Sequence, residues 1–367
     1  MKVLALASYP VQAAATRYRL EQFVQPLAEQ GISLSIRPFL DSDLFEILYQ
    51  RRAFPRIAIG LIKSAFLRLN DLITASEADV VLLQREAMMF GPPLIEWFAA
   101  RVLKRPLVLD LDDATYVSYT SPTYGSLGKY LKWFSKTDDL IRWSSIVTCG
   151  NSTIAEYVAR KGGVARVIPT VVDTDLFRPA PGKNDPLVLG WIGTHSTFPY
   201  LKEILPVMQY LAKTYRFRLK VVGAGKQEVK VPGVEVENLE WTLPREVQDF
   251  QSFDIGLYPI SPHLYAEGWA AGKSGFKSIQ YMAVGIPYVV SPVGAAAELG
   301  ESGMTHFPAR TNDEWRDALA LLLSDPEKRK QMGAAGRRYV IKNYSLPAQA
   351  DKLVQALREA AKKRKTL

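Results

Sequence analysis

The sequence has little of the residues that carry thiol and metal chemistry. Among 367 residues there are one cysteine and three histidines. Because Cys149 is the only cysteine, an intramolecular disulfide is excluded, and its isolation fits a reducing compartment. The few histidines form no HExxH motif, no zinc-ligand spacing with cysteine and no recognisable Ser-His-Asp set. Zinc chemistry and serine hydrolysis are therefore poorly supported.

Long apolar runs are also missing. No run reaches the roughly 18 residues of a membrane span, and the opening MKVLALASYP is too short and too quickly polar for a secretory signal. We therefore expect a cytoplasmic protein.

Acidic residues are fewer than basic ones, 37 against 46, which gives a net charge of +9. This excess favours anionic partners such as nucleotides or a phospholipid surface. Zinc-finger spacings and RNA-binding signatures are absent from the sequence, so we expect no nucleic-acid partner.

The length and the alternation of apolar runs with helical patterns indicate an α/β fold with two domains. A segment with four prolines and no periodicity, Pro169 to Pro186, has the composition of an interdomain linker. We expect two doubly wound parallel-sheet domains, residues 1–175 and 176–345. A helix with a basic tail, residues 346–367, follows and can pack back on the N-terminal domain.

The first predicted strand is followed by a loop with two arginines. Thr16 can cap a helix over about Arg17 to Gln30. Arg17 and Arg19 then lie at a helix start, where the helix dipole disfavours cations. An anionic acceptor bound at the carboxyl edge of the sheet would explain them, and so would ordinary solvent exposure.

A later buried strand, RPLVLDLDDA, ends in carboxylates. Asp110 and Asp112 point to one side by the period of two, and Asp113 points to the other. We expect Asp112 and Asp113 to line the active site. Capping of the following turn is the alternative.

The stretch Gln50 to Asn70 contains five basic residues and no acid. Its apolar positions, at Ile57, Leu61, Ile62, Ala65, Phe66 and Leu69, fit an amphipathic helix. Its basic residues are Arg51, Arg52, Arg56, Lys63 and Arg68. Contact with an anionic membrane leaflet and a core helix with a basic outer face are both consistent with this pattern.

In the second half, Gly268 to Gly294 reads as loop, short helix and buried strand. Ser274 is a suitable N-cap, and Gly285 can take the left-handed position after the helix. Lys273 and Lys277 bracket the helix start, where cations are disfavoured.

Amide N–H groups, two lysines and the small Gly275 can together form a diphosphate cradle, while Gln280 can bind an attached ribose. A solvated helix with two surface lysines is the alternative. Earlier, the small-residue loop Gly193, Thr194, His195 follows the first strand of the second domain. A phosphate or leaving group can lie there, with His195 as a hydrogen-bond donor.

Two segments, VIPTVVDTDLFRP and QYMAVGIPYVVSPVG, resemble the interdomain segment and donor-site helix of family 4 glycosyltransferases. The resemblance implies the GT-B fold, in which two Rossmann-like domains face each other across a cleft. It also implies retaining transfer of a sugar from a nucleotide diphosphate, usually with no essential metal and no other cofactor. The diphosphate would lie at the start of the helix before YVVSPVG.

The sequence departs from this family at defined positions. The typical pair of glutamates would fall on Gly272 and Gln280, and the usual basic pair after the glycine loop is missing unless Lys202 serves. The family's frequent catalytic histidine falls near Asp112 and Asp113. The pattern GK-x-x-FK-x-x-QYMA resembles a branch that acts in bacterial surface polysaccharide assembly, in which Lys273 and Lys277 would neutralise the phosphates.

The resemblance thus predicts a peripheral membrane hexosyltransferase that uses a UDP- or GDP-sugar and a lipid-linked or polysaccharide acceptor. A non-catalytic nucleotide-sugar-binding scaffold and a nucleotide-sugar epimerase are the alternatives. The candidate catalytic residues are Asp112, Asp113 and His195. The candidate donor-binding residues are Gly193, Thr194, Lys273, Ser274, Gly275, Lys277 and Gln280. The acceptor-side candidates are Arg17 and Arg19.

Overall fold

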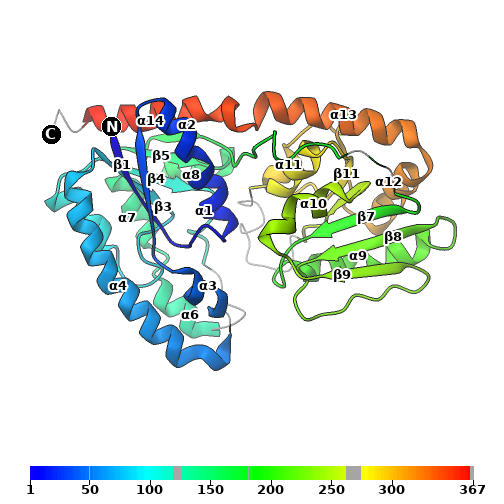
Figure 1. Ribbon diagram of the computed structural model, residues 1–367, viewed down its shortest axis with the longest axis horizontal. Helices are drawn as coiled ribbons and strands as arrows, with labels where there is room; N and C mark the ends of the chain where they lie inside the picture. The colour runs from blue at the N-terminus through cyan, green and yellow to red at the C-terminus, as the bar shows by residue number, and fades with distance from the viewer. Residues whose placement is uncertain (49, 119–124, 181, 183, 262–273, 364–367) are drawn as a thin grey trace. The chain divides into compact units, whose positions relative to one another are not determined.

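The computed structural model describes residues 1–367 except 49, 119–124, 181, 183, 262–273 and 364–367 (Figure 1). The chain divides into two compact units. The first comprises Met1–Thr170 and Gln349–Leu367, and the second comprises Val171–Ala348. Each unit is built on one six-stranded parallel sheet with helices, which confirms the predicted α/β class.

The first unit has the strand order β2-β1-β3-β4-β5-β6. Its strands are β1 (Lys2–Ala7), β2 (Ser33–Pro38), β3 (Val80–Gln84), β4 (Leu107–Leu111), β5 (Ile146–Cys149) and β6 (Ala165–Val167). Its α-helices are α1 (Ala14–Arg19), α2 (Val24–Glu29), α3 (Ser42–Ile47), α4 (Phe54–Glu77), α5 (Leu94–Trp97), α6 (Gly125–Lys132), α7 (Lys136–Trp143) and α8 (Ser152–Arg160). Short 3-10 turns cover Glu21–Phe23 and Arg51–Ala53, and a π-helical turn covers Phe98–Val102.

The second unit has the strand order β12-β11-β10-β7-β8-β9. Its strands are β7 (Leu187–Ile192), β8 (Phe217–Val222), β9 (Glu235–Leu239), β10 (Ile255–Tyr258), β11 (Tyr288–Val290) and β12 (His306–Pro308). Its α-helices are α9 (Phe198–Leu211), α10 (Glu246–Gln251), α11 (Phe276–Ala283), α12 (Asn312–Ser324) and α13 (Pro326–Asn343). Short 3-10 turns cover Leu243–Arg245 and Gly294–Ala297. The last helix, α14 (Leu346–Lys363), belongs to the first unit from Gln349 onward.

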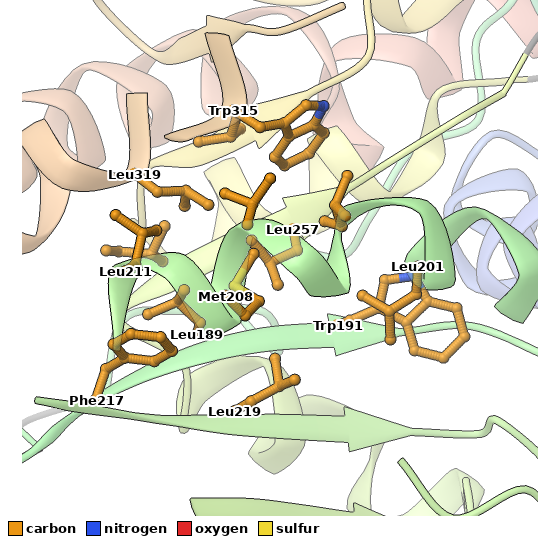
Figure 2. Packing of buried hydrophobic residues seen from close by; sticks show 14 of the residues in the cluster. Leu189, Trp191, Leu201, Met208, Leu211, Phe217, Leu219, Leu257, Trp315 and Leu319 are labelled. Carbon is orange, nitrogen blue, oxygen red and sulfur yellow. The ribbon is translucent and has the colours of Figure 1, made fainter. Parts of the chain in front are cut away.

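The central strands are buried on both faces, as expected for a sheet covered by helices. Every residue of β3, β4, β10 and β11 is buried. In the second unit, α9 and α12 pack side chains such as Met208 and Trp315 against Leu189 and Leu257 of the sheet (Figure 2). This core holds the strand ends of the second unit in place.

Two predicted helix N-caps are wrong, one by three residues and one by a single residue. The helix after β1 begins at Ala14 with Ala13 as N-cap, and the segment is broken at Leu20 into α1, a 3-10 turn and α2. The Thr16 hydroxyl lies inside α1 and donates to the Tyr9 carbonyl at 2.7 Å, so it caps no helix. The helix α11 has Gly275, not Ser274, as its N-cap, with φ at +66°. The predicted left-handed Gly285 is confirmed, with φ at +73°.

The predicted amphipathic helix is α4, but its faces differ from the prediction. Ile57 and Arg68 are buried, whereas Ile62, Phe66 and Leu69 are more than half exposed. The alternative of a core helix with a purely basic outer face is therefore wrong, and membrane contact stays a prediction. Among the described helices, none is long and apolar enough to cross a membrane.

Candidate functional site

The strand order of the second sheet changes direction between β7 and β10, since the chain adds β8 and β9 on one side and β10 to β12 on the other. In open parallel sheets, the carboxyl ends of the strands at such a switch point leave a crevice where ligands bind. Here the loops that leave the two strands begin at Gly193 and Pro259. A ligand site of the second unit is therefore expected at this place.

A small pocket is found at this switch point. It is lined by Trp191, Thr197, Tyr200, Tyr258, Pro259, Ile260 and Lys277. These residues come from the ends of β7 and β10, the loop before α9, α9 itself and the first turn of α11. The structure therefore brings the predicted lysine of α11 to the same pocket as the hydroxyl loop after β7. One cation and no acid stand among these lining residues.

The position of α11 on the sheet is fixed by Tyr281. Its buried hydroxyl lies 3.0 Å from the Leu257 carbonyl oxygen and 3.2 Å from that of Gly190, so it is anchored to both switch-point strands. A Cβ on Gly256 would lie 2.6 Å from the Tyr281 ring, so glycine is needed for this close approach. The anchored tyrosine holds the first turn of α11 beside the strand ends.

Lys277 and Gln280 project from α11 in different environments. The Lys277 Nζ lies 5.6 Å from the centroid of the Tyr258 ring, a cation–π distance. Gln280 is only 3% exposed, and its Nε2 is buried with no hydrogen-bond partner among the described residues. Because an unsatisfied buried donor costs about 1–3 kcal/mol, this amide is suited to a partner that arrives with a ligand.

The loop after β7 is held by its own hydroxyl groups. The Thr194 amide donates to the Thr197 Oγ1 at 3.0 Å, and the Thr194 and Ser196 hydroxyls are 2.8 Å apart. The Thr194 carbonyl accepts from the Phe198 amide at 2.9 Å at the start of α9. Thr194 and His195 are both exposed, so this loop presents polar groups to solvent.

The first sheet has its own switch point, between β1 and β3, and charged residues gather there. Arg85 follows β3 directly and has a positive φ of 65°. Its Nε and Nη2 donate to the two carboxylate oxygens of Asp112, both at 2.6 Å. The Arg85 Nη2 also lies 3.6 Å from Asp113 Oδ2.

The ion pair with Arg85 determines the protonation state of Asp112. Burial alone would raise the pKa of this carboxyl, but the charge and hydrogen bonds of Arg85 outweigh burial and hold the pKa below its usual value. Asp112 is thus an ionised carboxylate with both oxygens engaged. The Asp113 side chain is 29% exposed, against 9% for Asp112, and is the more accessible of the two.

The family model described as "Glycosyl transferase-like" matches residues 206–355 of the chain. Among curated proteins, no sequence relative matches. The solved structure of Anabaena HepE in complex with UDP and glucose is similar, with a TM-score of 0.66 and 14% identity over 97% of this chain and 99% of that chain. The sucrose-phosphate synthase of Thermosynechococcus elongatus has a TM-score of 0.67 and 14% identity over 98% of both chains. The lipopolysaccharide outer core galactosyltransferase WaaB has a TM-score of 0.62 and 14% identity over 97% of this chain and 99% of that chain.

The structural likeness shows the fold, and the family model supplies the class of enzyme. On that match over residues 206–355, the chain is a glycosyltransferase. It has the GT-B fold of these structures.

The structure places some of the predicted donor-site residues at or near the switch-point pocket, and their roles stay a prediction. Lys277 lines the switch-point pocket together with Thr197, which closes the Gly193 to Ser196 loop. Gly275 is buried, and a Cβ there would lie 2.4 Å from Leu299 Cδ1, so protein atoms occupy the space on that side. Lys273 and Gly272 lie outside the described residues.

On the acceptor side, Arg19 needs a correction. It is 5% exposed and forms an ion pair with Asp110, with its Nε 3.0 Å from the Asp110 Oδ2. Burial lowers the pKa of Arg19, but Asp110 outweighs burial and raises it. A guanidinium engaged in this way inside the glycosyltransferase is a structural group, so Arg19 is removed from the acceptor-side candidates.

Arg17 is only partly buried, but its Nη1 donates to the Gln12 carbonyl at 3.0 Å. It therefore braces its own loop. Its contact with an acceptor stays a prediction.

The sequence reasoning missed Arg85, Tyr258 and Tyr281. Arg85 was not singled out because its pairing with Asp112 joins residues 27 positions apart. A signal was available, since an arginine directly after one buried strand and a carboxylate directly after the next lie on the same sheet edge.

Within the described residues, no three His, Cys, Asp or Glu side chains are placed to hold a metal ion.

Proposed function

We propose that this glycosyltransferase transfers a hexose from a UDP- or GDP-sugar, with retention of configuration, to a lipid-linked or polysaccharide acceptor at the inner face of the plasma membrane. The pathway would be bacterial surface glycan synthesis. The observation that carries the proposal is the pocket at the β7/β10 switch point, where Lys277 and the loop containing Thr197 meet.

The diphosphate would occupy the start of α11. Lys277 supplies a positive charge there, and the first-turn amides of a helix favour an anion. The departing nucleoside diphosphate develops negative charge in the transition state, so a cation placed in advance lowers the barrier. Gln280 would donate its buried Nε2 to a ribose hydroxyl oxygen, which would satisfy the unmet donor.

Of the two carboxylates in the first unit, we assign the substrate contact to Asp113. Both oxygens of Asp112 are engaged by Arg85, whereas Asp113 is closer to solvent and lies 3.6 Å from the same guanidinium. Asp113 would orient the acceptor hydroxyl or stabilise positive charge developing on the sugar. Asp112 would act through Arg85 by holding it in place.

Two of the similar structures support the choice of donor and acceptor. HepE is described in complex with UDP-glucose, and WaaB is described as a lipopolysaccharide outer core galactosyltransferase. A uridine nucleotide and a surface glycan are therefore the first candidates to test.

The test is a thermal-shift panel of UDP, GDP, ADP and their common sugars, with and without magnesium. A ligand at 100 times its dissociation constant adds about 2.7 kcal/mol of stability. We expect one nucleoside diphosphate to stabilise the protein without metal, and its sugar to be consumed when an acceptor is added. No shift with any nucleotide would contradict the donor site. A shift without transfer would indicate a binding scaffold, and conversion of the donor alone would indicate an epimerase.

A further inference from the structure

We propose that the outward face of α4 docks on an anionic lipid membrane. This face, called the α4 ridge, consists of Ile59, Ile62, Phe66, Leu69 and Ile73, with exposed fractions of 69%, 58%, 65%, 52% and 68%. The docking deepens the proposed action on a membrane-held acceptor and rests on that proposal for its biological role.

The ridge is one continuous stripe. Its members are spaced three, four, three and four residues apart, and at 100° per residue this spacing keeps them on one side of the helix. From Ile59 to Ile73 the stripe is about 21 Å long at 1.5 Å per residue. Single exposed apolar residues are normal on a protein surface, but an aligned apolar stripe marks an interaction site.

The α4 ridge is not the side of α4 that packs on the core, because a different side of the helix does so. Ile57, Arg68 and Ala75 are at most 2% exposed and lie on the opposite face. The buried Arg68 guanidinium donates to the carbonyls of Ala7 and Arg37, both at 3.0 Å, and to Asp71 at 2.8 Å. These bonds fix the rotation of α4 and keep the ridge outward.

The charges around the ridge favour an anionic surface over a second copy of the chain. Arg56 and Lys63 are exposed on one flank, and Arg52 is exposed just before the helix. No acidic residue occurs between Glu46 and Asp71, and Asp71 is engaged by Arg68. Two ridges packed together would place cations near cations, whereas anionic headgroups beside a buried apolar stripe match both features.

The test is co-sedimentation of the full-length protein with vesicles of phosphatidylcholine alone or mixed with phosphatidylglycerol, with no donor or acceptor present. We expect binding to the mixed vesicles that is at least about tenfold stronger than to the neutral ones. Ile62→Ser with Phe66→Ser should weaken it by about tenfold or more, and so should Arg56→Glu with Lys63→Glu. The matched control is Leu321→Ser with Ile341→Ser, which removes two exposed apolar side chains, 42% and 46% exposed, from α12 and α13.

Wild-type protein that stays in the supernatant, or an Ile62→Ser/Phe66→Ser variant that binds like the wild type, would overturn the proposal. A dimer in light scattering that this variant splits would also overturn it, in favour of a second copy. The variant must keep the thermal unfolding transition of the wild type, which shows that it is folded. Because vesicle binding needs no nucleotide, its failure is distinguishable from a failure of the proposed transfer.

Discussion

The two sheets of this glycosyltransferase present different chemistry at their switch points. In the first unit, Arg85 engages Asp112, and neighbouring Arg19 engages Asp110, so the charged groups are satisfied within the protein. In the second unit, the pocket between β7 and β10 is lined by one lysine, hydroxyl groups and aromatic rings, without an acid among its lining residues. At the switch point of the first sheet, arginines and aspartates neutralise one another. At the switch point of the second sheet, the pocket lining is suited to an anion.

This contrast shows that charged residues at a strand edge can be engaged by one another inside the protein. The arginines and aspartates at the switch point of the first unit are the more conspicuous group in the sequence, yet most of them form ion pairs with one another. The few polar groups at the second edge are the ones that we propose contact the donor. In particular, the buried Gln280 amide has a donor that the described residues do not use.

The largest expected effect is a loss of folding stability when the Arg85–Asp112 ion pair at the first switch point is removed. Replacing Asp112 with Asn removes the closest counter-ion of the largely buried Arg85 side chain, which is 19% exposed, and breaking such a pair typically costs about 3–5 kcal/mol of folding stability. Urea unfolding measures the loss. The control is Asp113→Asn, whose partner lies 3.6 Å away and whose side chain is more exposed, so it should cost under about 1 kcal/mol. Equal losses in the two variants would contradict the assignment.

The Arg85–Asp112 ion pair also predicts that folding stability depends on pH. Because the pKa of Asp112 is lowered in the folded protein, its contribution to stability is present above the ordinary carboxyl pKa and is lost as the pH falls through the lowered value. Acid unfolding of the wild type should therefore show a loss that Asp112→Asn lacks. Parallel stability curves for the two proteins below the ordinary carboxyl pKa would argue against it.

The second edge is tested by Lys277→Ala. Removing a group that stabilises transition-state charge typically lowers kcat by about 10²–10³. Lys213 provides a matched control, since its Nζ lies 5.5 Å from the Tyr210 ring centroid, close to the 5.6 Å between Lys277 and Tyr258. Lys213→Ala should leave turnover unchanged. Similar kinetics for both variants would remove Lys277 from the donor site.

A smaller effect on nucleotide affinity should follow from Gln280→Met, which keeps the side-chain volume but removes the Nε2 donor that has no hydrogen-bond partner. The apo protein should be as stable as the wild type or more stable by about 1 kcal/mol, because an unsatisfied buried group is gone. Affinity for the nucleoside diphosphate should fall about tenfold, which is 1.4 kcal/mol. Calorimetry measures both. A less stable apo protein with unchanged affinity would show that Gln280 is structural.

Much of the fold could be predicted from the sequence, because buried strands and glycine turns carry local signals. The strands around Leu107–Leu111 and Tyr288–Val290 and the left-handed Gly285 are examples. Helix caps were less predictable: Thr16 and Ser274 are good caps by residue type, but Thr16 hydrogen-bonds Tyr9 and Gly275 takes the cap position with a positive φ.

The site was only partly predictable, since its partners are far apart in the chain. Lys277 could be found from its unfavourable place at a helix start. The pairing of Arg19 with Asp110, 91 residues apart, could not, because it depends on how α1 meets β4. The α4 ridge was also hidden, since Ile57 and Ile62 look alike in sequence and only packing separates the inner face from the outer one.

The most direct test of the contrast between the two edges is hydrogen exchange with and without the nucleoside diphosphate that stabilises the protein. We predict slower exchange in peptides covering Gly193 to Thr197 and Phe276 to Gln280, with little change around Arg85 and Asp112. Protection around Arg85 and Asp112, with none at the start of α11, would contradict the account.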